Sequence, residues 1–156
     1  MLQAGSKSPV VEVTELSGTV WRLDEALRAG PVLLVFFKIA CPTCRLTLPF
    51  LQRLAERGQA GSPALLAISQ DDAAMTQAFF DRFGIRVPAA IDKAWDYKAS
   101  NAFGITIVPS IFLVEPEGVV SMAAEGFVKT DLEQLGLRFG VAPFEAGESV
   151  PELRPG

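Results

Sequence analysis

Hydrophobic residues form short runs whose spacing separates strands from helices. Residues 32–37 and 64–68 are continuous apolar runs, which is typical of strands that are buried on both faces of a sheet. Between these runs, every fourth residue from Leu46 to Leu54 is apolar, the spacing that gives a helix one apolar face. The pattern therefore predicts a strand, a helix over 42–57 and a second strand, in that order.

The rest of the chain continues this alternation. We expect an N-terminal hairpin from residues 10–13 and 19–21, a helical turn over 24–29, helices over 72–83, 96–103 and 129–139, and strands over 87–91, 110–114 and 119–124. Helices between the early strands predict parallel crossovers, and the late hairpin predicts an antiparallel edge. The expected fold class is α/β, with a central mixed sheet and helices on both faces.

Length and composition predict a single domain. The chain has 156 residues, of which 49% are hydrophobic and 21% charged, a balance that suits one globular domain with a sizeable core. We place this domain at residues 1–140. Residues 141–156 contain three prolines and little periodicity. They are expected to form a C-terminal extension that is either flexible or docked on the body through Val141 and Phe144. We expect a monomer.

Charge and residue content exclude several classes of function. The net charge is −4 and no basic cluster is present, so nucleic-acid binding is not expected. The chain has no histidine, which excludes Ser-His-Asp and Cys-His centres and histidine zinc sites. Two cysteines cannot complete a four-cysteine zinc site within one chain, so we expect no metal.

The N-terminal residues predict no targeting segment. They contain no apolar stretch long enough for a signal peptide, and the longest apolar run, 31–37, is too short to cross a membrane. We therefore expect no membrane insertion. The chain as given is expected in the cytoplasm, or in the periplasm or another extracytoplasmic space if an N-terminal signal was removed.

The two cysteines lie in the stretch Cys41-Pro42-Thr43-Cys44, between the first buried strand and the helix that follows it. Cysteines three residues apart in a first helical turn are close enough to form a disulfide. The first thiol lies where unpaired backbone N–H groups and the positive helix end favour an anion, here the reactive thiolate. Cys41 would attack a substrate disulfide, and the more buried Cys44 would then attack Cys41 and release the reduced substrate.

Neighbouring residues could support this chemistry. Pro42 falls near the first helical position, where its missing N–H costs little. Lys38 and Arg45 are nearby cations that could stabilise the thiolate, although ordinary solvated charges are the simpler interpretation. The cysteine spacing by itself also fits two buried structural cysteines or half of a metal site.

The sequence resembles the thioredoxin superfamily over about residues 10–140. Two features of the predicted active site carry part of this resemblance. Cys-Pro-Thr-Cys-Arg at 41–45 is similar to the motif of the TlpA-like and cytochrome c maturation thioredoxins. Pro49 stands five residues after the second cysteine, at the offset where thioredoxins have a proline that kinks the active-site helix. The extra helix and strand over 72–91 match an insertion that separates TlpA-like proteins from plain thioredoxin.

The second half of the chain carries two further points of resemblance. Residues 104–110, Gly-Ile-Thr-Ile-Val-Pro-Ser, resemble the segment with the cis-proline of the family, and Gly118 and Gly126 follow at similar spacing. The resemblance implies a cis bond between Val108 and Pro109 that faces the cysteines. It also implies that the backbone of Val108 pairs with substrate.

The resemblance implies a thiol–disulfide oxidoreductase that acts as a reductant. Its redox group would be the Cys41–Cys44 pair itself, with no other cofactor. Its partners would be protein thiols and disulfides and an upstream electron donor. Pro42 and Thr43 would support substrate binding together with the cis-proline segment.

Three positions depart from the pattern of the family. Ala40 stands where a tryptophan is usual before the first cysteine. Val35 stands where thioredoxin has a buried aspartate, and Thr47 where TlpA-like reductases have a buried glutamate. Neither acid that would take the proton of Cys44 is therefore present at its usual position.

Two alternative functions remain open from the sequence. The first is a peroxiredoxin-like peroxidase, but Lys38 and Leu34 occupy positions where the peroxidatic motif has threonine or serine and proline. The second is a non-catalytic chaperone or metal-binding module that retains the cysteine pair. The missing acid and the missing tryptophan favour that alternative.

Overall fold

The computed structural model describes all 156 residues. The strands are β1 (Glu12–Glu15), β2 (Val20–Arg22), β3 (Val32–Phe37), β4 (Ala64–Ser69), β5 (Ala89–Ile91), β6 (Ser110–Val114), β7 (Val120–Glu125), β8 (Phe127–Val128) and β9 (Leu153–Arg154). The helices are α1 (Leu23–Leu27), α2 (Pro42–Arg57), α3 (Ala73–Phe83), α4 (Lys98–Ala102) and α5 (Lys129–Phe139).

The first seven strands form one mixed sheet in the order β2-β1-β5-β4-β3-β6-β7. The central strand β3 pairs in parallel with β4 and antiparallel with β6. Strand β5 continues the parallel part, and the hairpins β1–β2 and β6–β7 form the two antiparallel edges. All six residues of β3 are buried, which is the burial that its continuous apolar run predicted.

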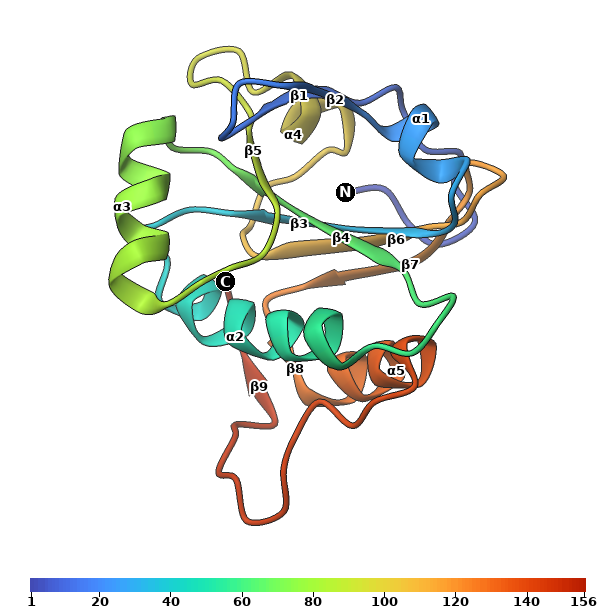
Figure 1. Ribbon diagram of the computed structural model, residues 1–156, viewed down its shortest axis with the longest axis vertical. Coiled ribbons are helices and arrows are strands. Elements are labelled where there is room, and N and C mark those ends of the chain that lie inside the picture. Colours follow the sequence, from blue (N-terminus) through green and yellow to red (C-terminus); the bar gives the residue numbers. More distant parts are fainter.

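Alternate residues of β3 contribute to two separate cores. Leu33, Val35 and Phe37 belong to the larger core, together with apolar residues of α2, α3 and α5. Leu34 and Phe36 belong to the smaller core, which includes residues of α1 and α4. Figure 1 shows α2 and α5 on one face of the sheet and α1 and α4 on the other. The predicted α/β fold, a mixed sheet with helices on both faces, is confirmed.

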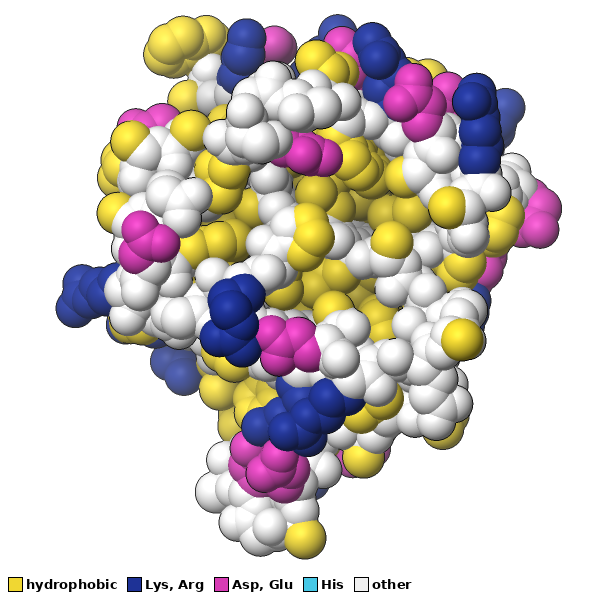
Figure 2. Space-filling view, viewed as in Figure 1, with side chains coloured by type: hydrophobic (Ala, Val, Ile, Leu, Met, Phe, Trp, Pro, Cys, Tyr) yellow, Lys and Arg dark blue, Asp and Glu magenta, His cyan; other side chains and the backbone are white.

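Charged side chains surround the hollowed middle of the face shown in Figure 2, where apolar side chains are visible. Dark blue and magenta groups often lie next to each other there. Seven ion pairs connect arginine or lysine to glutamate in the structure. Much of the basic charge is therefore balanced locally by acidic side chains.

The helix expected over 96–103 is shorter than predicted. Trp95 and Tyr97 have positive φ angles of 60° and 40°, a backbone conformation outside the right-handed helical region. The helix therefore begins only at Lys98. The buried carboxylate of Asp92 accepts hydrogen bonds from two backbone N–H groups in its first turn.

Residues 141–156 lie against the body of the protein. Val141 and Phe144 pack against the larger core, and the ring of Phe144 lies 5.0 Å from that of Phe50 in α2. Farther along, β9 pairs antiparallel with β8, a small sheet that the sequence pattern does not predict. No helix of the structure is long and apolar enough to cross a bilayer.

The larger core predicts where a truncation is costly. Leu51 in α2 is 0% exposed, whereas Leu137 in α5 is 83% exposed. We expect Leu51→Ala to lower the free energy of unfolding by about 3 kcal/mol because it leaves a cavity. The matched variant Leu137→Ala should change it by less than about 0.5 kcal/mol. Urea unfolding followed by circular dichroism measures both, and equal losses would contradict this assignment of the core.

Candidate active site

The end of β3 and the start of α2 place Cys41 at the edge of the sheet. Strand β3 ends at Phe37, and α2 begins at Pro42. In the loop between them, the N–H of Ile39 donates a hydrogen bond of 2.8 Å to the Oδ2 atom of Asp71. Asp71 follows β4, which runs parallel to β3, so the carboxyl ends of the two strands meet here. The carboxylate therefore helps to fix the path of the chain into the cysteine pair.

Cys41 is the N-cap residue of α2, and its sulfur accepts a hydrogen bond from the backbone N–H of Cys44 at 3.1 Å. The same sulfur lies 3.4 Å from the backbone oxygen of Val108, to which the thiol donates. Both cysteines are free thiols. Cys41 is partly exposed and Cys44 is 0% exposed. This asymmetry lets one sulfur meet a substrate while the other stays inside.

Burial raises the pKa of the Cys44 thiol far above its ordinary value, and its contact with the side chain of Cys41 raises it further. No carboxylate is among the groups that act on it. Val35 lies fully buried in β3, and the hydroxyl of Thr47 donates to the backbone oxygen of Thr43 at 2.7 Å. Neither position therefore supplies a proton acceptor to Cys44.

The peptide bond between Val108 and Pro109 is cis, as the resemblance implied. It lies just before β6, which pairs with β3. This pairing brings residues 107–109 to the same edge as Cys41. The backbone oxygen of Pro109 accepts a hydrogen bond of 2.8 Å from the N–H of Gly126. The residue after β7 is therefore attached directly to the cis-proline.

The two candidate cations point toward aromatic rings. The ammonium group of Lys38 lies 6.0 Å from the ring centre of Tyr97, and the guanidinium of Arg45 lies 4.5 Å from that of Phe83. Neither side chain makes a hydrogen bond to Cys41 in the structure. Their role in tuning the thiolate therefore stays a prediction.

Two hollows flank the cysteine pair. One of about 220 Å³ is lined by Lys38, Gln70, Tyr97, Ser100, Asn101 and residues 105–108. The other, of about 430 Å³, has a mainly apolar lining of Ile39, Ala40, Met75, Ala78, Phe79 and Phe83, together with Arg45 and Arg82. A substrate bound at Cys41 would have both surfaces within reach. The structure has no group of three or more residues that could hold a metal ion.

The sequence did not identify two contacts at this site. The first is the hydrogen bond from the N–H of Ile39 to Asp71, the residue before Asp72, which caps α3. The position of Asp71 after a strand parallel to β3 was the available signal. The second contact joins the hydroxyl of Thr43 to the backbone oxygen of Pro155 at 2.6 Å, and no local pattern indicates it.

The fold and the site together define a thioredoxin-like protein with two cysteines at the start of the helix that follows its central strand. The chain belongs to the AhpC/TSA family, whose pattern matches residues 4–123. The AhpC/TSA family is thioredoxin-like, so the expected membership in the thioredoxin superfamily is confirmed.

A named relative and two solved structures share this arrangement. The chain is 28% identical over 132 residues to "Thiol-disulfide oxidoreductase ResA" of Geobacillus thermodenitrificans, covering 83% of this chain and 74% of that protein. It superposes with a TM-score of 0.77 on the thioredoxin domain of a thiol-disulfide oxidoreductase from Bacteroides vulgatus, at 21% identity. That match covers 89% of this chain and 99% of the other.

The second structure is described as a thiol:disulfide interchange protein DsbE from Chlorobium tepidum. Its TM-score is also 0.77, at 23% identity, and the match covers 88% of this chain and 96% of that one. At these identities the two structures bear on the fold alone. The predicted class of enzyme agrees with the names of the relatives.

The burial of Cys44 predicts a pH dependence. To attack a mixed disulfide on Cys41, Cys44 must lose its proton, and below its pKa the thiolate fraction rises about tenfold per pH unit. Because its pKa is raised and no carboxylate assists, the rate of this step should rise about tenfold per unit between about pH 7 and 9. Absorbance stopped-flow on a chromogenic mixed disulfide measures it. A plateau below about pH 8 would reveal a base that the structure does not show.

Proposed function

We propose that this protein is a thiol–disulfide oxidoreductase that reduces disulfides of other proteins. The sulfur of Cys41, as thiolate, attacks one sulfur of the substrate disulfide and forms a mixed disulfide, while the other substrate sulfur leaves and takes up a proton. The sulfur of Cys44, after losing its own proton, attacks Cys41 and expels the second substrate thiol. The substrate gains two electrons, and the chain ends with a Cys41–Cys44 disulfide.

The hydrogen bond from the N–H of Cys44 to the sulfur of Cys41 carries this proposal. It places the first sulfur at the start of a 16-residue helix, where backbone N–H groups stabilise a thiolate. The second cysteine lies one helical turn away, and its buried thiol contacts the side chain of the first. Two structural cysteines would have no need of a partly exposed first sulfur.

The surroundings of Cys41 support a reductant rather than an oxidant. A strongly oxidising dithiol has a reduced form that its surroundings stabilise. Here the Cys41 sulfur accepts a hydrogen bond from the N–H of Cys44, and Lys38 and Arg45 contact aromatic rings instead. Because no cation contacts the Cys41 sulfur, the reduced pair lacks a stabilising charge of the kind that would make it a strong oxidant, and it should give up electrons readily.

The reaction requires an electron donor. Each turnover leaves the pair oxidised, so a second dithiol or an equivalent reductant must restore it. We propose that the two thiols are the whole redox group, that no other cofactor takes part and that the chain works as a monomer. The substrates proposed are protein disulfides, as the thiol–disulfide oxidoreductase names of the relatives suggest.

Two single substitutions test the roles of the cysteines. Cys41→Ser should lower insulin disulfide reduction about a hundredfold or more because the attacking sulfur is lost. Cys44→Ser should instead accumulate a mixed disulfide on Cys41, visible by mass spectrometry as substrate added to the chain. The Cys41→Ser variant serves as the control for that adduct. Peroxide consumption without disulfide reduction would move the chain to the peroxidase alternative, and tight peptide or metal binding without turnover to the binding module.

The direction of electron flow has its own measurement. We expect the reduction potential of the Cys41–Cys44 pair to lie near that of thioredoxin, roughly −270 mV, because no cation contacts the Cys41 sulfur in the reduced form. Equilibration in glutathione or dithiothreitol buffers, followed by alkylation and mass spectrometry, gives the value. A potential near roughly −120 mV would identify an oxidant and would contradict the proposed direction.

A further inference from the structure

We propose that residues 153–156 form a strap that determines which disulfides can reach Cys41. The strap covers the backbone groups beside this sulfur and must move aside before a polypeptide can pair with them, whereas small disulfides pass without that movement. The inference rests on the proposed function because it concerns access to the same sulfur. It adds a specificity-determining segment that lies outside the cysteine motif.

The strap contacts the cysteine motif itself. The hydroxyl of Thr43, between the two cysteines, donates a hydrogen bond of 2.6 Å to the backbone oxygen of Pro155. The side of the strap at Arg154 lines a shallow hollow together with Pro42, Arg45 and Leu46. Figure 1 shows the end of the chain marked C next to the start of α2. The strap therefore occupies one side of the approach to Cys41.

The strap also covers the segment on the opposite side of the sulfur. A Cβ atom added to Gly156 would overlap the backbone oxygen of Val108 and the side chain of Ile107. A Cβ on Gly126 would lie 2.7 Å from the backbone oxygen of Arg154. Backbone thus packs directly on backbone at both positions. The oxygen of Val108 lies 3.4 Å from the Cys41 sulfur, so the strap and the thiol meet at the same group.

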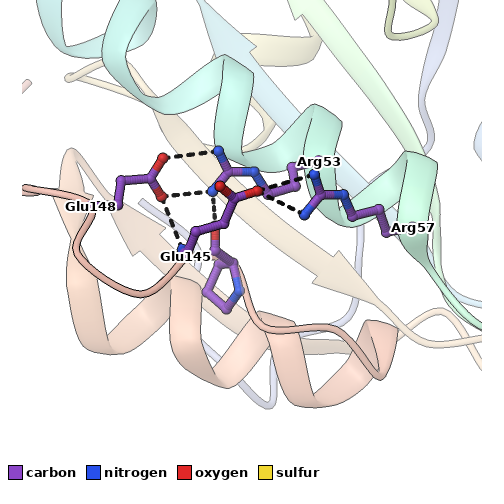
Figure 3. A network of polar contacts seen from close by, with 5 residues as sticks. Arg53, Arg57, Glu145 and Glu148 are labelled. Carbon is purple, nitrogen blue, oxygen red and sulfur yellow. Dashed lines mark hydrogen bonds and ion pairs between the residues drawn. The ribbon is translucent and has the colours of Figure 1, made fainter.

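The segment before the strap is firmly attached to α2. The guanidinium of Arg53 makes two hydrogen bonds to the carboxylate of Glu148, at 2.7 and 2.9 Å, and a third to the backbone oxygen of Pro143. Two nitrogens of the Arg57 guanidinium donate to the Oε1 atom of Glu145, each at 3.1 Å. Figure 3 shows both arginines reaching from α2 to the two glutamates. The hydrogen bonds from Arg53 lower the pKa of Glu148 to about 2, so this anchor persists at neutral pH.

The strap is held far more weakly than its anchor. Every residue from 151 to 156 is exposed, and no strap side chain enters the core. The attachment consists of the short pairing of β8 with β9, the hydrogen bond to Thr43 and the backbone packing on Gly126 and Val108. Beyond the anchor, Val150 packs against the larger core and Glu152 is held by Lys129. The strap can therefore swing away after Glu152 while residues 141–152 stay in place. This contrast makes the strap a movable cover.

The strap affects large and small disulfides differently. A polypeptide that forms a mixed disulfide with Cys41 must lay its backbone beside Thr43 and Val108, where the strap now lies. A small disulfide needs access to the sulfur alone, which is partly exposed. If the strap is open about one-tenth of the time, reaction with polypeptides is slowed about tenfold relative to a chain without it.

A chain that ends at Glu152 tests the proposal. It keeps the ion pair to Lys129 and every contact of the anchor, and circular dichroism with thermal unfolding checks its fold. A second variant, Glu148→Gln, weakens the anchor and leaves the strap intact. Arg22→Gln, which breaks a surface ion pair to Glu12 of the β1–β2 hairpin, is the matched control. Each chain is reacted with insulin and with hydroxyethyl disulfide, and Cys41 is alkylated with iodoacetamide and with a maleimide-bearing extended peptide.

Removal of the strap should speed the reactions with insulin and with the maleimide peptide about tenfold. Hydroxyethyl disulfide and iodoacetamide should change less than about twofold, and Glu148→Gln should give an intermediate gain with the large reagents. Unchanged rates with the large reagents, or equal gains with all four, would overturn the strap. If no chain reduces insulin but the shortened chain still gains with the maleimide peptide, the proposed function fails while the strap stands.

Discussion

The position of the reactive sulfur depends on the burial of β3 between two cores. Leu33 and Val35 face one core and Leu34 and Phe36 the other, so the strand cannot shift by one residue without placing each set in the wrong core. Its end at Phe37 is therefore fixed, and so is the start of α2 five residues later, at Pro42. The position of Cys41 relative to the groups that contact it is therefore set by this junction between β3 and α2.

The elements around the junction converge because the ends of the parallel strands β3 and β4 and the start of the antiparallel strand β6 lie at one edge of the sheet. β4 brings Asp71 to the loop before Cys41, and β6 brings Val108 to its sulfur. These two contacts join residues that are 32 and 67 positions apart along the chain. The chemistry of the pair depends on this assembly: Cys41 meets backbone polar groups and solvent, whereas Cys44 faces the core, where burial keeps its thiol neutral.

Local patterns account for what the sequence could predict. The bounds of α2 were predicted in full because Cys41 and Pro42 mark its start and Gly58 follows its last residue. The position of the cysteine pair followed from the same signals, and the cis bond at Pro109 came from resemblance. The predicted start of α4 was wrong because two residues with positive φ angles, Trp95 and Tyr97, precede the helix. The pairing of β8 with β9 was not predicted. Strands of two residues are too short to show an alternation of apolar and polar positions, and the two strands lie far apart in the sequence.

The burial of Cys44 also bears on oxidative damage. Oxidants in solution meet the partly exposed sulfur of Cys41 first, while the other sulfur is shielded by the core. A sulfenic acid formed on Cys41 would find Cys44 within one helical turn, and condensation of the two gives a disulfide with loss of water. That disulfide can be reduced again, whereas further oxidation to sulfinic or sulfonic acid cannot readily be reversed. The buried cysteine thus confines the damage to its reversible stage.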